Sequence, residues 1–433
     1  MTKVSLTGPE QSILNGDHGR LKQLALENIV RYAEVLGADR LCPVTKATVF
    51  CGNHNYLAVC PDKNIEAVFA KMNLATDELI KFDALDPGCQ TQSCVSPCDQ
   101  REYRPFKQSE EFFDRNQAFL EMARSAGVTL AGSCAPYLNG WLPVRGEHFV
   151  TTESGVTIVG NSLWGARGNS DGIEAAFWSA ICGRTPYWGL HRPENRRGTV
   201  LVRVETQVAT MTEWDLLGRA IGVQLPTGSI PVVTGDLRSP DFNKLRQFLT
   251  TVAITSNCEM CLVDGLSPEA EPSLSELKVN LDAPRLTVTL ADLKAAYEDI
   301  CPPGESPLGL VSLGCPHYDI AQIQYVAAQL KGKKIHPNVD FMVWTSFPIK
   351  ALADDNGYTG VIEEAGGRVY TGTCPGTIGD NFVGSYPALL FDSFKQVTST
   401  RSHTDQPVYF GEVDRCLEAA VSGQWKEEYR WDK

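Results

Sequence analysis

The sequence predicts an α/β protein of several domains with mostly parallel sheets. Residues expected as strands and helices alternate in the last part of the chain. The expected strands cover 308–313, 340–345 and 367–373, and the expected helices cover 319–330, 348–356 and 358–366. Strands joined by helical crossovers pair in parallel, because the crossover returns the chain to the same end of the sheet. A chain of 433 residues is also too long for one ordinary domain.

The elements before this region follow from apolar spacing and turn residues. Residues 9–37 place apolar side chains at helical spacing, and Gly37 provides a stop signal. The further elements are a helix at 110–126, short buried strands at 128–134 and about 156–159, a turn of small residues at 161–172, a helix at 173–181, a strand at 199–210 and a polar loop at 264–276. We expect the strand at 199–210 to close the first of three α/β domains, which cover 1–210, 211–305 and 306–433.

The composition argues against several classes of protein. The net charge is −13, with 39 basic and 52 acidic residues, whereas a non-specific nucleic-acid binder needs a basic surface. No stretch approaches the roughly 18 apolar residues that would suggest a membrane span, and no signal-peptide pattern is visible at the start. We therefore expect a cytoplasmic protein that binds neither nucleic acid nor membrane. Its 14 cysteines are then reduced thiols, used for packing, metal binding or catalysis.

Three cysteines follow three expected strands directly. Cys134 ends VTLAGSC, Cys315 ends LGLVSLGC and Cys374 ends GRVYTGTC, and a proline follows each at once or after one residue. Ligands of parallel α/β sheets bind outside the carboxyl ends of the strands, so these thiols could meet in one cleft. Three thiolates suit an iron–sulfur cluster with one open iron better than a closed structural zinc site, which takes four ligands. The alternative is that all three are ordinary buried cysteines.

Long blocks around these cysteines resemble the large subunit of the aconitase X family. The blocks are ILNGDHGRLKQLALENIVRYAEVLGADRL, SCAPYLNGWLPVRGEHFVTTESGVTIVGNSLWGARGNSDG, GRTPYWGLHRPENRR, VSLGCPHYDIAQIQYVAAQLKGKKI, GYTGVIEEAGGRVYTGTC and VYFGEVDRCLEAAVSGQW. The resemblance implies the aconitase-like multi-domain α/β/α architecture without its small swivelling domain. It also implies that Cys134, Cys315 and Cys374 hold an iron–sulfur cluster, 4Fe–4S or 2Fe–2S.

Known members of the family dehydrate small hydroxy acids, either cis-3-hydroxyproline or 5-phosphomevalonate. The resemblance therefore implies an iron–sulfur-dependent hydro-lyase, with cis-3-hydroxy-L-proline or a related hydroxycarboxylate as the first candidate substrate. It places the proton-abstracting serine on a separate small swivel-domain subunit, so that activity needs this partner. The alternative function is a non-catalytic iron–sulfur or zinc protein that senses metal or redox state. A zinc hydrolase fits poorly, because no HExxH motif is present among seven histidines.

Other residues are candidates for binding or catalysis. The expected substrate-binding residues are the polar members of the small-residue turn and one arginine at a helix end: Asn161, Ser162, Arg167, Asn169 and Arg184. The expected catalytic residues are Glu147, His148 and His191. An ordinary glycine-rich turn, a solvated charged loop and a buried ion pair are the structural alternatives. Arg196 is as readily a solvated residue as a ligand.

Five further cysteines could form a second metal site. Cys89, Cys94 and Cys98 lie within ten residues of a polar loop, and Cys258 and Cys261 have the spacing of zinc and redox pairs. Cys51 or Cys60 could supply a further ligand. The alternative is that each is an isolated thiol.

The sequence departs from the family pattern at several positions. Thr48 stands where a histidine is expected, with His54 displaced, and Ser402 stands at an expected lysine position in TSTRS, where a TNSAK-like block is expected. These departures indicate a changed pocket around a retained metal centre.

Overall fold

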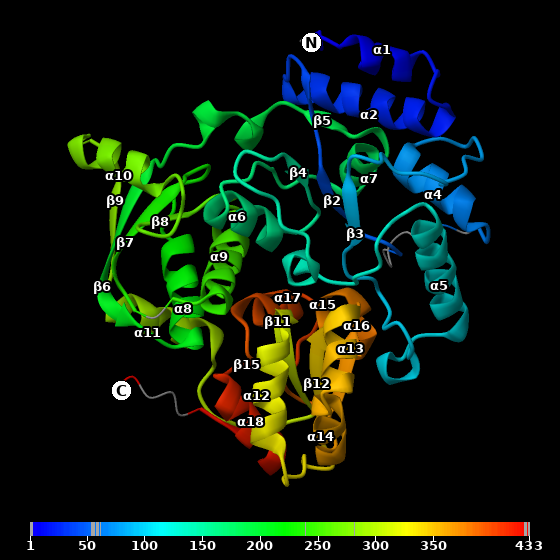
Figure 1. The fold of residues 1–433 in the computed structure, drawn as a ribbon. Coiled ribbons are helices and arrows are strands. Elements are labelled where there is room, and N and C mark those ends of the chain that lie inside the picture. The colour runs from blue at the N-terminus through cyan, green and yellow to red at the C-terminus, as the bar shows by residue number, and fades with distance from the viewer. Residues whose placement is uncertain are drawn as a thin grey trace.

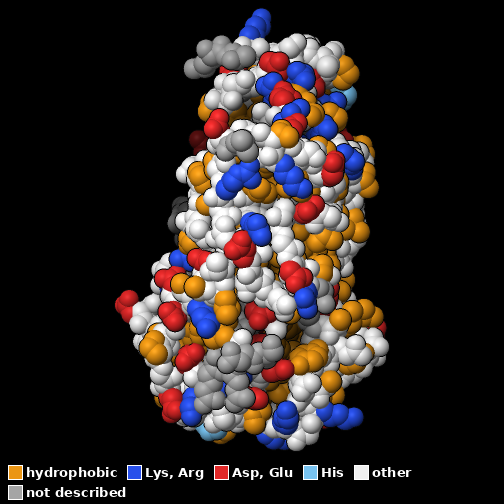
Figure 2. Space-filling view, turned by 90° about the vertical axis from the view of Figure 1, so that its left-hand side faces the viewer, with side chains coloured by type: hydrophobic (Ala, Val, Ile, Leu, Met, Phe, Trp, Pro, Cys, Tyr) orange, Lys and Arg blue, Asp and Glu red, His pale blue; other side chains and the backbone are white. Residues whose placement is uncertain are grey.

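The structure is a computed structural model that describes residues 3–427 except 53–56, 58, 59, 61, 239 and 281, together with residue 431. His54 therefore lies outside the described residues. Three regions follow one another along the chain, each with a parallel sheet and covering helices (Figure 1). No helix in the described part is long and apolar enough to cross a membrane. On the face in Figure 2, acidic and basic side chains are interspersed.

The N-terminal region is built on a small parallel sheet in the order β3-β2-β4 and an antiparallel pair, β1-β5. The strands are β1 (Leu41–Pro43), β2 (Lys46–Val49), β3 (Gln90–Ser93), β4 (Phe149–Val150) and β5 (Arg184–Pro186). The helices are α1 (Gly8–Leu14), α2 (Arg20–Leu36), α4 (Ile65–Leu74), α5 (Glu110–Ser125), α6 (Ser154–Leu163) and α7 (Ile173–Cys182). A short 3-10 turn, η3 (Gly189–His191), leads out of this region.

The middle region has a four-stranded parallel sheet in the order β8-β7-β6-β9. Its elements are β6 (Val200–Val208), α8 (Met211–Gly222), β7 (Pro231–Leu237), α9 (Phe242–Ser256), β8 (Leu262–Val263), α10 (Ala270–Val279), β9 (Arg285–Val288) and α11 (Leu290–Ile300). The strand expected at 199–210 is β6. It pairs with β7 and β9 and is therefore an inner strand of this sheet, where the sequence predicted the last element of the preceding domain.

The C-terminal region has a five-stranded parallel sheet in the order β13-β12-β11-β14-β15. The strands of this sheet are β11 (Leu310–Tyr318), β12 (Asp340–Thr345), β13 (Arg368–Thr371), β14 (Leu389–Phe391) and β15 (Val408–Phe410). The region also has a separate antiparallel pair, β10 (Glu305–Pro307) and β16 (Gln424–Lys426). Its helices are α12 (Ile320–Leu330), α13 (Phe347–Asp355), α14 (Tyr358–Ala365), α15 (Pro375–Ile378), α16 (Asp380–Val383), α17 (Phe394–Arg401) and α18 (Val413–Ser422). The predicted alternation of strands and helices and the predicted α/β class are confirmed.

Three local predictions were wrong. The expected strand at 156–159 is part of α6, whose residues from Gly155 to Ser162 are all buried, and a short apolar run does not distinguish a buried strand from a buried helix. The single helix expected at 9–37 is two helices, because Gly16 and Gly19 between them have φ values of 88° and 90°. The loop expected at 264–276 contains the start of α10, whose Leu274 and Leu277 are buried.

The expected strand at 128–134 is not a strand of any sheet, although backbone hydrogen bonds join it to Thr91, Ser93 and Phe347. Only Thr129 forms a bridge, with Gln92 at the edge of the N-terminal sheet. Gly132 then turns the chain with a φ of 58°, a left-handed conformation that favours glycine. A Cβ on Gly132 would lie 2.7 Å from the Phe347 ring, so the close approach of these segments also requires glycine.

The N-terminal and C-terminal sheets meet through the loops that follow their strands. Ser96 N donates to Gly372 O at 2.6 Å, and Phe347 N donates to Ala131 O at 3.1 Å. In Figure 1 the top of the C-terminal region, with α15 and α17, lies against the lower end of the N-terminal region. The carboxyl ends of two parallel sheets therefore face each other, which is where ligands of such sheets bind.

Asp99 fastens this junction. The Asp99 carboxylate accepts hydrogen bonds from Thr371 N at 2.8 Å and Thr371 Oγ1 at 3.1 Å, at the end of β13. It also accepts from the N–H groups of Arg101 and Glu102 at 2.8 and 3.0 Å. We expect Asp99→Ala to lower the free energy of unfolding by about 2–4 kcal/mol, because buried donors lose their acceptor. Urea denaturation measures this, and Asp405→Ala at an exposed position is the control that should leave stability unchanged.

The stability of the protein depends on pH through the buried carboxyl group of Asp215. Burial raises the pKa of Asp215 to about 7, although hydrogen bonds from Phe394 N, Thr251 and Gln247 oppose the rise. The folded state therefore keeps a proton that the unfolded chain, with a pKa of about 3.9, releases. The free energy of unfolding thus falls as pH rises from about 4 to about 7.

We expect Asp215→Asn to remove this contribution. The stability of the variant relative to the wild type should then rise with pH, by a total on the order of 3 kcal/mol between pH 4 and pH 8. Urea denaturation at several pH values, followed by tryptophan fluorescence, measures the difference. A difference that does not change with pH would show that Asp215 is ionised in the folded protein throughout.

Candidate active site

Cys134, Cys315 and Cys374 line one cavity of about 190 Å³. The cavity lies at the junction of the N-terminal and C-terminal regions. Its other lining residues come from both sides: Val95, Glu153, Gly314, His317, Gly376, Thr377, Lys395, Gln396 and Ser399. The sequence predicted that these three thiols meet, and the structure places them together.

Each cysteine reaches the cavity from a different element. Cys134 follows the turn at Gly132, Cys315 lies in the last part of β11, and Cys374 caps the N-terminus of α15 just after β13. Since β11 and β13 belong to the same parallel sheet, their carboxyl ends lie at one edge. Cys134 approaches this edge from the N-terminal region.

Polar groups surround the three thiols. The backbone N–H of His317 donates to Cys134 Sγ at 3.4 Å, and the Thr377 hydroxyl lies 3.6 Å from Cys374 Sγ. Burial raises the pKa of Cys134 to about 12 and also raises the pKa values of Cys315 and Cys374. The thiols are therefore protonated at neutral pH unless a metal displaces their protons.

Lys395 contributes a positive charge to this cavity and was not among the predicted site residues. Its ammonium group lies 3.5 Å from Glu153 Oε2, with the Lys395 side chain 24% exposed. Burial alone would lower the pKa of Lys395, but the carboxylate of Glu153 raises it above its ordinary value, and the three cysteines add to the rise once they are thiolates. Glu153 Oε1 also accepts a hydrogen bond from Cys94 Sγ at 3.0 Å. Lys395 is thus a charged ammonium group at neutral pH.

The sequence contained a signal for Lys395. In FDSFK (391–395), a serine and a lysine stand in the same order as in the TNSAK-like block, after strand β14. In the TSTRS block at 398–402, by contrast, Ser402 is exposed at the end of α17, and only Ser399 lines the cavity.

The predicted substrate-binding residues do not line the cysteine cavity. Asn161 and Ser162 lie in α6, where Asn161 bonds Gly168 and Arg196, and Ser162 accepts from Cys261 N. Arg184 forms an ion pair with Glu10 at 2.9 Å. Asn169 accepts from Leu190 N at 2.7 Å. Arg196 is buried and pairs with Glu269 at 2.6 Å. These contacts are those of residues that hold segments together.

The predicted catalytic residues lie elsewhere too. Glu147 accepts from Thr45 and from Val144 N and pairs with Lys46 at 3.4 Å. His148 and His191 face each other, with their Nδ1 atoms 3.0 Å apart. None of Glu147, His148 and His191 lines the cysteine cavity.

The five additional cysteines do not converge on one metal site. Cys258 and Cys261 follow α9 in the middle region, whereas Cys94 lies beside Glu153 at the cavity and Cys89 packs in the core of the N-terminal region. Within the described part of the chain, no three ligand atoms from this group lie within 4.8 Å of one another. The loop that carries Cys89, Cys94 and Cys98 is also buried and not a polar surface loop.

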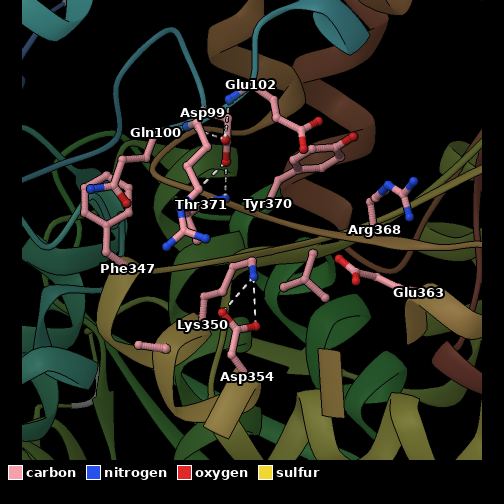
Figure 3. A pocket seen from close by; sticks show the side chains of 13 residues that line it. Asp99, Gln100, Glu102, Phe347, Lys350, Asp354, Glu363, Arg368, Tyr370 and Thr371 are labelled. Carbon is pink, nitrogen blue, oxygen red and sulfur yellow. Dashed lines mark hydrogen bonds and ion pairs between the residues drawn. The ribbon is translucent and has the colours of Figure 1, made fainter. Parts of the chain in front are cut away.

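A second cavity, of about 150 Å³, lies on the other side of the junction (Figure 3). Lys350 pairs there with Asp354 at 2.8 Å, and Asp99 points toward Thr371. None of the predicted ligands lines this cavity. Its Asp99 and Thr371 form the hydrogen bonds that hold the end of β13 in place.

Comparison with known proteins covers nearly the whole chain. Residues 3–194 match the aconitase X first domain, residues 198–298 the second domain and residues 308–422 the third domain. The phosphomevalonate dehydratase large subunit of Methanothermobacter thermautotrophicus is 30% identical over 374 residues, which cover 86% of this chain and 88% of that protein.

The chain belongs to the aconitase X family.

Other relatives and a solved structure agree with this membership. The phosphomevalonate dehydratase large subunit of Methanocaldococcus jannaschii is 29% identical over 95% of this chain and 99% of its own length. The cis-3-hydroxy-L-proline dehydratase of Pseudomonas aeruginosa is 28% identical over 96% of this chain and 70% of its own length. The crystal structure of Thermococcus kodakaraensis aconitase X in its holo-form has a TM-score of 0.79 and 27% identity, covering 96% of this chain and 100% of that one.

The predictions of an aconitase X large subunit, of its α/β fold and of an aconitase X-type hydro-lyase are thereby confirmed. The aconitase X relatives carry two different substrate names. The chain resembles them almost equally, at 29% and 28% identity, so similarity does not choose between the two substrates.

Proposed function

We propose that this chain is the catalytic large subunit of an iron–sulfur-dependent dehydratase of a small hydroxy acid, with its active site at the cysteine cavity. The observation that carries the proposal is the combination of three thiols and a charged lysine in that cavity. A metal sensor needs the thiols, but it has no evident use for a cation placed beside them. An enzyme that binds an anionic substrate next to a metal uses both.

The donor set fits a cluster with one iron free for substrate. Cys134, Cys315 and Cys374 are proposed as its ligands, three thiolates where a closed structural site would take four ligands. The N–H of His317 and the hydroxyl of Thr377 are placed to stabilise the negative charge of bound sulfur. When bound, such a cluster supplies a Lewis acid that polarises the substrate hydroxyl as it leaves.

The residues of this chain bind and orient the substrate. The Lys395 ammonium is proposed to attract the carboxylate or phosphate of the substrate into the cavity. Glu153, at 3.5 Å, holds the Lys395 side chain in position, and Cys94 donates to the other oxygen of the same carboxylate. Both oxygens of Glu153 therefore have partners, and the Lys395 ammonium group stays directed at the cavity.

We place the base that removes the substrate proton on a small swivel-domain subunit, where the family resemblance puts a serine. That subunit would cover the cavity and exclude water from it. The first candidate substrate is cis-3-hydroxy-L-proline, and 5-phosphomevalonate is the second.

The test is anaerobic co-expression with a small-subunit protein of the family, reconstitution with iron and sulfide, and assay of both substrates for loss of water. We expect dehydration of a hydroxy acid only when both chains are present. An intact cluster with no turnover of any hydroxy acid, in the presence of the partner, would support the metal-sensor alternative.

A further inference from the structure

Cys42, His148 and His191 form a compact group outside the cysteine cavity. One ligand atom from each lies within 4.8 Å of the others, and no other such group of three or more occurs among the described residues. Cys42 lies in β1, His148 directly precedes β4, and His191 ends η3. Cys42 and His191 are buried, whereas His148 is partly exposed and provides a path from solvent.

Buried polar atoms without partners occur in this group and in two charged residues that act on Cys42. His191 Nε2, Arg167 Nε and Asp171 Oδ2 are all buried, and none has a hydrogen-bond partner among the described residues. Such atoms each cost free energy, and in native proteins they indicate a bound ion or ordered water nearby. Their concentration around two histidines and a cysteine points to an ion at this place.

We propose that Cys42, His148 and His191 bind one Zn²⁺ ion, through Cys42 Sγ and one ring nitrogen of each histidine. A thiolate and two imidazoles are ligands that Zn²⁺ prefers, whereas Mg²⁺ and Ca²⁺ take oxygen ligands. The 3.0 Å between the two Nδ1 atoms is compatible with two ligands of a single ion. On binding, the Cys42 thiol releases its proton to solvent, and the fourth position is left for water.

Negative groups offset part of the charge of such an ion, against the opposing charges of Arg167 and Arg196 nearby. The Cys42 thiolate and the carboxyl group of Asp171 supply negative charge.

The ion would join three segments that are distant in sequence. His191 lies where the chain leaves the N-terminal region for the middle region, and Cys42 and His148 lie at the strands of the N-terminal region. The site therefore has a structural role that does not depend on the proposed dehydratase chemistry.

The test uses the full-length chain with Cys134→Ser, which removes a ligand from the cysteine cavity and so separates the two sites. After treatment with a chelator, the protein is titrated with Zn²⁺ and, in parallel, with Co²⁺ as a coloured substitute. We expect one tight ion per chain and a thiolate-to-Co²⁺ absorption band. Adding Cys42→Ser should abolish the band, and adding His148→Gln should raise the Kd for Zn²⁺ by at least about 100-fold.

Two control variants change comparable residues outside the group: Cys182→Ser, at a buried cysteine of α7, and His403→Gln, at an exposed histidine. Both should retain the band and the affinity. Because His191→Gln at a buried position can prevent folding, the partly exposed His148 carries the decision. No tight ion in the Cys134→Ser chain, or an unchanged Kd after His148→Gln, overturns the proposal.

Discussion

Replacing Cys315 by serine is expected to abolish the bound iron and to lower dehydratase activity at least about 1,000-fold. Cys315 lies in the last part of the central strand of the C-terminal sheet, at the edge that lines the cavity. A metal Lewis acid contributes several kcal/mol to transition-state stabilisation, and each 1.36 kcal/mol corresponds to about a factor of ten in rate. Iron and sulfide content, visible absorption and turnover with the small subunit are the measurements.

The matched control for Cys315→Ser is Cys182→Ser, which changes a buried cysteine in α7, outside the cavity. It should retain the cluster and the activity. If Cys315→Ser kept the iron and sulfide of the wild type, the assignment of the cluster to this cavity would be wrong.

Replacing Lys395 by methionine is expected to lower kcat/KM at least about 100-fold without loss of the cluster. Methionine keeps most of the length of the side chain but removes the charge that pairs with the substrate anion. Truncating one member of a desolvated charge pair costs about 2–5 kcal/mol. The loss should lie largely in KM if Lys395 only binds the anion, and in kcat as well if the contact strengthens in the transition state.

Two further variants identify the cause of this loss. Lys395→Arg keeps the charge and should restore part of the activity, whereas Lys350→Met, in the cavity of Figure 3, should leave kcat/KM unchanged. Glu153→Gln tests the positioning role, since Lys395 then loses its ion-pair partner. Full activity of Lys395→Met with an intact cluster would exclude Lys395 from substrate binding.

The sequence predicted much of the C-terminal region because its pattern is local. The strand at 340–345 has the predicted bounds, and the helices that follow it begin and end within one residue of the prediction. Strand and helix periods alternate there without ambiguity. Since Cys315 and Cys374 lie at the ends of such strands, their meeting at one edge also followed from the sequence.

The predictions failed where long-range packing decides the structure. The run around Val156 is short and mostly apolar, and it belongs to a helix, α6, that is buried on all faces. The partners of His148 and Asn169, His191 and Leu190, lie about 20 to 45 positions along the chain, so no local pattern could indicate these contacts. Lys395 was also missed, because only the folded cavity brings it together with the three cysteines.

Because the N-terminal and C-terminal sheets face each other across the cysteine cavity, metal binding there would affect how long the protein persists in a cell. Any metal group held by Cys134 together with Cys315 and Cys374 cross-links two parts of the chain that otherwise meet through hydrogen bonds such as those of Asp99. A ligand that binds only the folded state adds RT ln(1 + [L]/Kd) to its stability. Iron supply would then act on protein turnover as well as on catalysis. Chains left without metal would open more often at this junction and be degraded first.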